Sequence, residues 1–259
     1  MESSPKPTGF LIDLDGTVVE GDRLIPGAAE ALAFLEREGL PYRLVTNTTS
    51  KPRAAILAKL ADLGLTVPAD ALFTAPVIAR DYLRQHGFTR CYPLFKHSLR
   101  EDLVGIEFVE RDPQAVVVGD LGDELSYEAL NRAFRFLLEG AAFVTLARNR
   151  YFKGAEGLCL DVGAIVAALE YAAQRTATLI GKPAPEFFLP ALQSMGKSPE
   201  QTAMIGDDLE ADIGGAQAAR LAGLLVRTGK YRAEQVEKSE LRPDATLDSL
   251  ADLPGWLGG

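Results

Sequence analysis

The stretch Phe10-Leu11-Ile12-Asp13-Leu14-Asp15-Gly16-Thr17 decides the fold of this chain. Consecutive apolar residues are typical of a strand that is buried on both faces, as in a parallel sheet. Two carboxylates follow with one residue between them, and the glycine after them favours a sharp turn. The pattern therefore predicts a strand over residues 9–14, with Asp13 and Asp15 placed at its end to serve one site.

This motif has two alternative interpretations. Asp and Gly favour turns in any protein, so an ordinary acidic loop is one of them. A calcium-binding loop is the other, and it is excluded because it needs Asp or Asn at position 17 and Gly at position 18. The chain has Thr17 and Val18 there. The motif alone therefore leaves an acidic loop and a functional site open.

Strand-like and helix-like segments alternate along the whole chain. Such alternation predicts βαβ units and a parallel sheet whose strands end at one ligand-binding edge. The expected strands are 9–14, 42–45, 90–95, 115–118, 142–146, 176–180, 202–205 and 222–226. The expected helices are 28–38, 51–63 after an N-cap at Ser50, 126–138, 162–173, 186–195 and 213–221.

Polar clusters follow two of the other expected strands. Thr46 and Asn47 come after 42–45, where a hydroxyl and an amide could donate hydrogen bonds to a phosphoryl oxygen. A polar turn leading into a helix is the alternative. Lys182 follows 176–180 between a glycine and a proline, which favours a fixed ammonium beside a phosphate. It is not a P-loop lysine, because Pro183 stands where Ser or Thr is required.

The strand 202–205 is followed by Gly206, Asp207 and Asp208, with Asp212 four residues further on. Asp208 and Asp212 would share one helix face, where like charges repel. A nearby cation would offset that repulsion, and a few carboxylate oxygens suit Mg²⁺. For Asp212, an acid that complements the N-terminal dipole of a helix is the alternative.

Composition limits the possible partners. The 259 residues, 47% of them hydrophobic, allow one large domain or two linked ones. A net charge of −9 argues against nucleic-acid and membrane-surface partners, although a bound cation would still permit an anionic substrate. No apolar run reaches membrane-spanning length, and residues 1–9 lack a secretory pattern. Cys91 and Cys159 have no metal-like spacing, so we expect reduced thiols in a cytoplasmic protein.

Together these clusters resemble a known family. They match, in order, the four motifs of the haloacid dehalogenase (HAD) superfamily, and the match covers nearly the whole chain. The chain is most similar to subfamily IIA, and residues 181–188 and 204–217 look closest to two groups within it. These are the groups of haloacid dehalogenase-like hydrolase domain-containing protein 2 and of phospholysine phosphohistidine inorganic pyrophosphate phosphatase. The matching motifs are Asp13-x-Asp15-Gly-Thr, Thr46-Asn47, Lys182 and Gly206-Asp207-Asp208-xxx-Asp212.

The resemblance implies an α/β fold class. We expect a Rossmann-like parallel-sheet core over residues 1–77 and 179–259, and an inserted C2-type α/β cap domain over 78–178. Homodimerisation through the cap is expected by analogy with the subfamily. Arg148, Asn149 and Arg150 follow a cap strand and are candidate substrate contacts, with ordinary solvated side chains as the alternative. Subfamily relatives often carry Asn-Pro-Asp near this position, so residue roles do not transfer directly.

The resemblance also implies a chemistry, that of a Mg²⁺-dependent phosphatase acting on small phosphorylated substrates. Asp13 would be the nucleophile that forms an aspartyl-phosphate, and Asp15 the general acid and base. Family phosphatases carry this second acid and dehalogenases lack it, so dehalogenation is not expected. The implied Mg²⁺ ligands are Asp13, the backbone carbonyl of Asp15 and Asp207, supported by Asp208 and Asp212. The implied phosphate-binding residues are Thr46, Asn47 and Lys182.

Three other functions stay open at this point. Pyrophosphate, phospholysine or phosphohistidine could be the substrate instead of a phosphate ester. A phosphomutase or phosphotransferase would use the same phosphoenzyme while excluding water. A phosphate-binding or scaffolding module without turnover is the non-enzymatic alternative, and the pair Asp13 and Asp15 weighs against it because mere binding needs neither acid.

Overall fold

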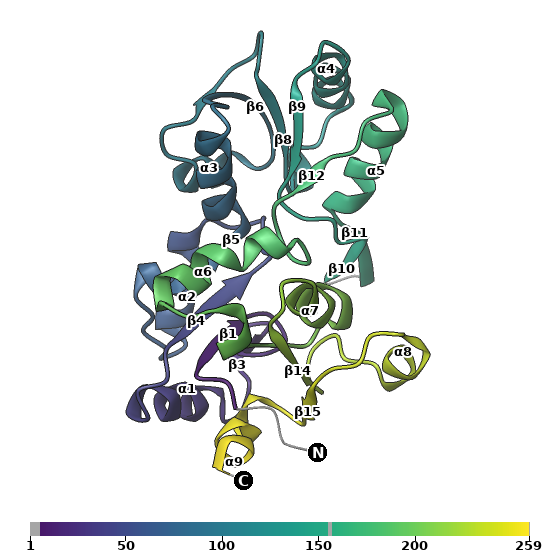
Figure 1. Cartoon of the computed structure of the whole chain (residues 1–259). Coiled ribbons are helices and arrows are strands. Elements are labelled where there is room, and N and C mark those ends of the chain that lie inside the picture. Colours follow the sequence, from purple (N-terminus) through teal and green to yellow (C-terminus); the bar gives the residue numbers. More distant parts are fainter. Residues whose placement is uncertain (1–5, 155–156, 259) are drawn as a thin grey trace. The chain divides into compact units, whose positions relative to one another are not determined.

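The computed structural model describes residues 6–154 and 157–258. These residues form two compact units, and Figure 1 colours them along the sequence. The first unit comprises 6–46, 57–73 and 182–258, and the second comprises 47–56 and 74–181. Residues 47–56, 74–77 and 179–181, which the sequence-based division assigns to the core, thus lie in the second unit. The roles of the units as catalytic core and cap stay predictions.

The first unit contains a six-stranded sheet. Its central strand, β1 (Gly9–Asp13), pairs in parallel with β4 (Tyr42–Thr46) and β13 (Thr202–Gly206). All five residues of β1 are buried, as the apolar run predicted for a strand covered on both faces. The strand order is β15 (Ala245–Leu247), β14 (Ala222–Val226), β13, β1, β4 and β5 (Leu72–Thr74).

Helices surround this sheet, and α1 (Ala28–Arg37) illustrates why they form. Its buried residues Ala28, Ala31, Leu32 and Leu35 recur at helical spacing, which gives one apolar face. A short antiparallel pair, β2 (Val19–Glu20) and β3 (Arg23–Leu24), precedes it. The other α-helices that lie entirely within the first unit are α6 (Leu189–Met195), α7 (Gly215–Ala218), α8 (Ala233–Lys238) and α9 (Leu253–Gly258).

The predicted N-cap at Ser50 is wrong. Helix α2 (Arg53–Asp62) begins three residues later, directly after Pro52. The backbone N–H of Arg53 donates to the Asp102 carboxylate at 2.8 Å. The Asp102 side chain, which is distant in sequence, therefore accepts a hydrogen bond from a backbone N–H in the first turn of this helix. Ser50 was expected to accept such a bond.

The second unit has its own parallel sheet. Its strand order is β12 (Thr178–Leu179), β9 (Ala142–Thr145), β8 (Ala115–Val118), β6 (Arg90–Leu94) and β7 (Glu107–Phe108). Helices α4 (Tyr127–Leu138) and α5 (Val162–Ala173) lie side by side in Figure 1 and share one apolar core with β6, β8 and β9. Helix α3 (Ala75–Gln85) and the hairpin of β10 (Tyr151–Gly154) with β11 (Gly157–Leu160) complete the unit.

Strand β12 corrects one premise of the sequence analysis. The expected strand 176–180 was taken to end at the same sheet edge as the strands before Asp13 and Asp207. It is instead a two-residue strand that pairs with β9 in the second sheet, Thr178 opposite Val144. Lys182 therefore does not follow a strand of the first sheet, although it belongs to the first unit. Among the described residues, no helix is long and apolar enough to cross a membrane.

Candidate active site

Two neighbouring strands bring the site's acids together. Asp13 is the last residue of β1, and Asp207 directly follows β13. Since these strands are parallel neighbours, both side chains lie at one sheet edge. Asp212 joins them from the helix that follows β13, so that one carboxylate oxygen of each lies within 4.8 Å of the others. All three residues are buried, with 6%, 2% and 1% exposure for Asp13, Asp207 and Asp212.

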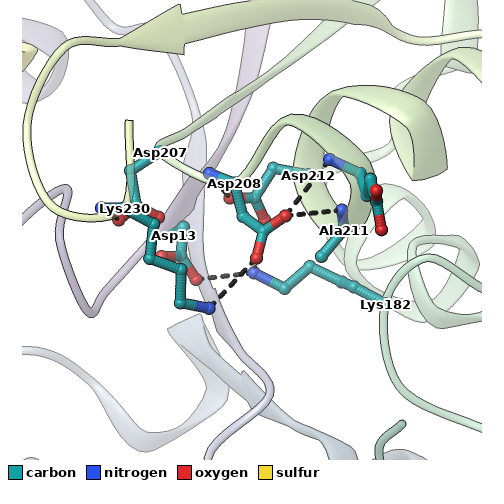
Figure 2. A network of polar contacts seen from close by, with 8 residues as sticks. Asp13, Lys182, Asp207, Asp208, Ala211, Asp212 and Lys230 are labelled. Carbon is teal, nitrogen blue, oxygen red and sulfur yellow. Dashed lines mark hydrogen bonds and ion pairs between the residues drawn. The ribbon is translucent and has the colours of Figure 1, made fainter. Parts of the chain in front are cut away.

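Lys182 is the ammonium of this cluster. Its side chain is buried, and Nζ donates to Asp13 Oδ1 at 2.5 Å and to Asp212 Oδ1 at 2.6 Å (Figure 2). Burial opposes the charge of the ammonium, but the two carboxylates outweigh burial and raise the pKa of Lys182. When ionised, three carboxylates and one ammonium carry a formal charge of −2.

Burial, together with this excess of negative charge, raises the pKa values of Asp13 and Asp207. Burial raises the pKa of Asp13 well above its usual value; Asp212 and Asp207 raise it further, while Lys182 opposes the rise. Burial, followed by the charge of Asp212, raises the pKa of Asp207 to about 7. A buried site with an excess of ionised oxygen ligands fits a divalent cation, which would stabilise the deprotonated carboxyls.

Asp208 and Asp212 occupy different environments, although the sequence analysis treated them as one supporting pair. Asp208 is the N-cap of the π-helical turn Leu209–Gly214, and its Oδ1 accepts from the N–H groups of Glu210 and Ala211. Its Oδ2 pairs with Lys230 Nζ at 3.0 Å. Burial would raise the pKa of Asp208, but Lys230 and the Ala211 N–H outweigh it and lower the pKa. This cap starts the helix at 209, four residues before the predicted start at 213.

Glycines allow the acids to approach the backbone closely. Gly16 and Gly229 have φ values of 94° and 56°, and a Cβ on either would overlap Asp207 Oδ2. A Cβ on Gly206 would likewise overlap the Asp212 carboxylate. Because the space is filled by the acids themselves, these positions require glycine for the site to keep its shape.

The remaining predicted residues are spread over both units. Asp15 is exposed in the turn after β1, where the N–H of Gly16 donates to Val19 at 2.7 Å. Thr46 is buried at the end of β4, the strand beside β1. The remaining residues predicted to contact phosphate or substrate belong to the second unit: Asn47, Arg148, Asn149 and Arg150.

Arg148 is already engaged within that second unit. It pairs with Glu170 of α5 at 2.6 Å. The carbonyls of Asn149 and Arg150 accept from the N–H groups of Gly163 and Asp161. The segment is thus fixed by its own neighbours, and its contact with substrate stays a prediction.

The segment Thr228-Gly229-Lys230 also contacts the site, although no sequence motif predicted it. The Thr228 hydroxyl donates to the Gly16 carbonyl, and the Lys230 N–H donates to Asp207 Oδ2 at 2.6 Å. The segment follows β14 in the first sheet, so the rule that found the other polar clusters at strand ends could have found it.

Comparisons with known proteins agree with this fold. The model of the family described as haloacid dehalogenase-like hydrolase matches residues 10–109, and a HAD-hydrolase-like model matches 179–253. Haloacid dehalogenase-like hydrolase domain-containing protein 2 of Bos taurus is 42% identical over 93% of this chain and 92% of its own length. The chain therefore belongs to the haloacid dehalogenase-like hydrolase family.

Two further relatives narrow the class. Phospholysine phosphohistidine inorganic pyrophosphate phosphatase of Homo sapiens is 37% identical over 96% of this chain and 93% of its own length. The crystal structure of 4-nitrophenylphosphatase from Thermotoga maritima superimposes with a TM-score of 0.90 at 30% identity, covering 96% of this chain and 97% of that one. Within its family, the chain is a phosphatase, and the predicted α/β class with a parallel-sheet core is confirmed.

Proposed function

We propose that this phosphatase is Mg²⁺-dependent and hydrolyses small phosphorylated compounds through an aspartyl-phosphate on Asp13. The observation that carries the proposal is the buried cluster of Asp13, Asp207 and Asp212 around the ammonium of Lys182. A phosphoryl group needs an oxygen nucleophile and positive charge close to it, and this cluster supports both requirements.

The chain's own residues carry the proposed steps. A carboxylate oxygen of Asp13 attacks phosphorus, and the bond from phosphorus to the leaving oxygen breaks as Asp15 gives that oxygen a proton. A water then attacks the phosphorus while Asp15 takes a proton from it, and breakage of the bond to Asp13 releases phosphate. Thr46 and Asn47 are the proposed hydrogen-bond donors to the phosphoryl oxygens, and Lys182 supplies charge.

Mg²⁺ is the proposed cofactor because the donors are carboxylate oxygens in a site of net negative charge. Asp13 and Asp207, with the backbone carbonyl of Asp15, would hold it. Asp212 supports them through its place in the same cluster, and Asp208 supports the start of the helix that carries Asp212. When bound, the cation neutralises charge that develops on the phosphoryl oxygens.

The test is phosphate release from a panel of phosphate esters, pyrophosphate and phosphoramidate, with and without Mg²⁺. We expect Mg²⁺-dependent release by the wild type and none by Asp13→Asn, which keeps the shape of the side chain without its nucleophilic charge. Asp62→Asn makes the same change on the exposed end of α2 and should keep full activity. Full activity in Asp13→Asn would refute the nucleophile assignment, and no release by the wild type across the panel would favour a binding or scaffolding module.

Hydrolysis of pyrophosphate or of phosphorus–nitrogen bonds is a second candidate activity. It is supported by the 37% identity to the Homo sapiens enzyme whose name specifies phospholysine, phosphohistidine and inorganic pyrophosphate. Faster release from phosphoramidate or pyrophosphate than from every ester in the panel would favour this activity. The opposite order would favour a phosphomonoesterase.

The larger organisation is part of the same proposal. Residues 78–178 would act as a cap that selects the substrate, through Arg148, Asn149 and Arg150, and would join two copies of the chain. A stable monomer in light scattering would remove the homodimer. A cytoplasmic location is supported by the free thiols of Cys91 and Cys159, and fractionation of the cells that produce the protein would test it.

A further inference from the structure

The loop between β14 and α8 reaches back to the turn that follows the proposed nucleophile. Thr228, two residues beyond β14, donates its hydroxyl to the carbonyl of Gly16. Gly16 is part of the turn that carries Asp15, so this bond ties the loop to the first motif across more than two hundred residues of sequence. We refer to Thr228, Gly229 and Lys230 as the 228–230 loop.

The same loop also holds Asp207. The backbone N–H of Lys230 donates to Asp207 Oδ2 at 2.6 Å, a charge-assisted bond to a buried carboxylate. Gly229 and Gly16 both lie against that oxygen, since a Cβ on either would overlap it. Figure 2 shows Lys230 beside Asp207, with Asp13 close by. Asp207 Oδ2 is thus fixed by a donor and by packing at once.

These contacts matter because a metal ligand must be oriented as well as present. Partners that hydrogen-bond to ligand side chains fix their direction, and losing one weakens metal binding by about 10- to 100-fold. The 228–230 loop contacts Asp207 and the turn after Asp13 together. It therefore sets the position of one proposed ligand relative to the segment that supplies the others.

We propose that the 228–230 loop is a positioning element of the phosphatase site, which aligns the Asp207 carboxylate with the turn after Asp13 for cation binding. The proposal rests on the proposed metal role of Asp207. Thr228 supplies the hydrogen bond to Gly16, and Gly229 packs against Asp207 Oδ2. Thr228 therefore acts through the turn at Gly16, and Gly229 acts through Asp207.

The experiment measures binding of Mg²⁺ alone, from the rise in melting temperature as MgCl₂ is added at constant ionic strength. Thr228→Val keeps the shape of the side chain and removes the hydroxyl, and we expect it to weaken Mg²⁺ binding by about 10-fold. Thr228→Ser keeps the hydroxyl and should stay within about 2-fold of the wild type. Thr246→Val makes the same change at an exposed position of β15 and should have no effect.

Activity gives a second readout. For Thr228→Val at limiting Mg²⁺ we expect a lower kcat with little change in the KM for substrate, and recovery of kcat as Mg²⁺ is raised. If the substitution merely damaged the structure, raising Mg²⁺ would not restore kcat. If Thr228→Val does not fold, Gly229→Ala tests the other contact of the loop, its packing against Asp207 Oδ2, with Gly255→Ala in open space as the control.

Asp207→Asn distinguishes failure of the proposed metal role of Asp207 from failure of the positioning role of the 228–230 loop. If it binds Mg²⁺ as tightly as the wild type, the metal role of Asp207 fails. If it loses Mg²⁺ binding while Thr228→Val and Gly229→Ala bind within about 2-fold of the wild type, the positioning role of the loop is refuted and the metal role stands.

Discussion

Lys182→Met removes the ammonium that separates the buried carboxylates. Methionine keeps much of the volume and the flexible stem of lysine, so the change acts mainly on charge. In the wild type, Nζ bonds to both Asp13 and Asp212, and the Lys182 side chain is 3% exposed. Breaking a buried ion pair from one side costs about 3–5 kcal/mol, because the remaining charge is left without its partner. We expect a loss of that size in the free energy of unfolding at pH 8.

The loss should depend on pH, and its sign follows from Asp13. Lys182 lowers the pKa of Asp13, so its removal raises that pKa further above the unfolded value of 3.8. An acid whose pKa is raised in the folded state favours folding when protonated, and this contribution disappears as pH rises through the folded pKa. The deficit of Lys182→Met relative to the wild type should therefore be smaller at pH 5 than at pH 8.

Urea denaturation of the metal-free proteins at both pH values measures this effect. Lys59→Met is the matched control, because Lys59 pairs at 3.3 Å with Asp22, whose side chain is 97% exposed. Exposed pairs contribute less than about 1 kcal/mol. Equal losses for Lys182→Met and Lys59→Met at pH 8, or a deficit that does not change between the two pH values, would refute the reasoning.

Three further predictions concern the site and its support. Because protons compete with the cation below the Asp207 pKa of about 7, Mg²⁺ binding should be about 10-fold weaker at pH 6 than at pH 8, and a flat titration profile would contradict this. Ser126→Ala removes the hydroxyl that accepts from the third residue of α4 and should cost about 1 kcal/mol in urea denaturation. Gly206→Ala places a Cβ onto the Asp212 carboxylate and should lower the melting temperature, whereas Gly255→Ala, in open space, should not.

The sequence predicted the regular part of the fold because buried strands and amphipathic helices leave periodic patterns. Strands 115–118 and 222–226 and helix 162–173 have the predicted bounds. Short elements carry too few residues for a pattern, which is why β5, β7, the β10–β11 hairpin and β15 were not expected. Helix α3 is different, since its N-cap Thr74 and the proline that follows are recognisable start signals that were overlooked.

Lys182 shows how a residue can be assigned to the right cluster from a wrong premise. Its position after the expected strand 176–180 predicted a place at the edge of the first sheet, yet β12 pairs with β9 in the other sheet. A two-residue strand has no sequence feature that selects its partner, because that choice depends on which edge the rest of the fold leaves available. The resemblance to the family motifs, and not the position after a strand, correctly predicted that Lys182 lies with Asp13 and Asp212.

Gly206, six positions before Asp212, helps to decide whether Asp212 complements a helix dipole or joins the metal cluster. Spacing alone could not decide, since an acid that complements a helix dipole and an acid that joins a metal cluster both suit the first turn. Asp208 caps that turn, which leaves Asp212 to accept from Lys182 and from the Asp208 N–H. This arrangement needs room at the end of β13, and Gly206 provides it because any Cβ there would overlap the Asp212 carboxylate. A dipole role would make no such demand on position 206, so the glycine before the acids is the sequence feature that favours the cluster.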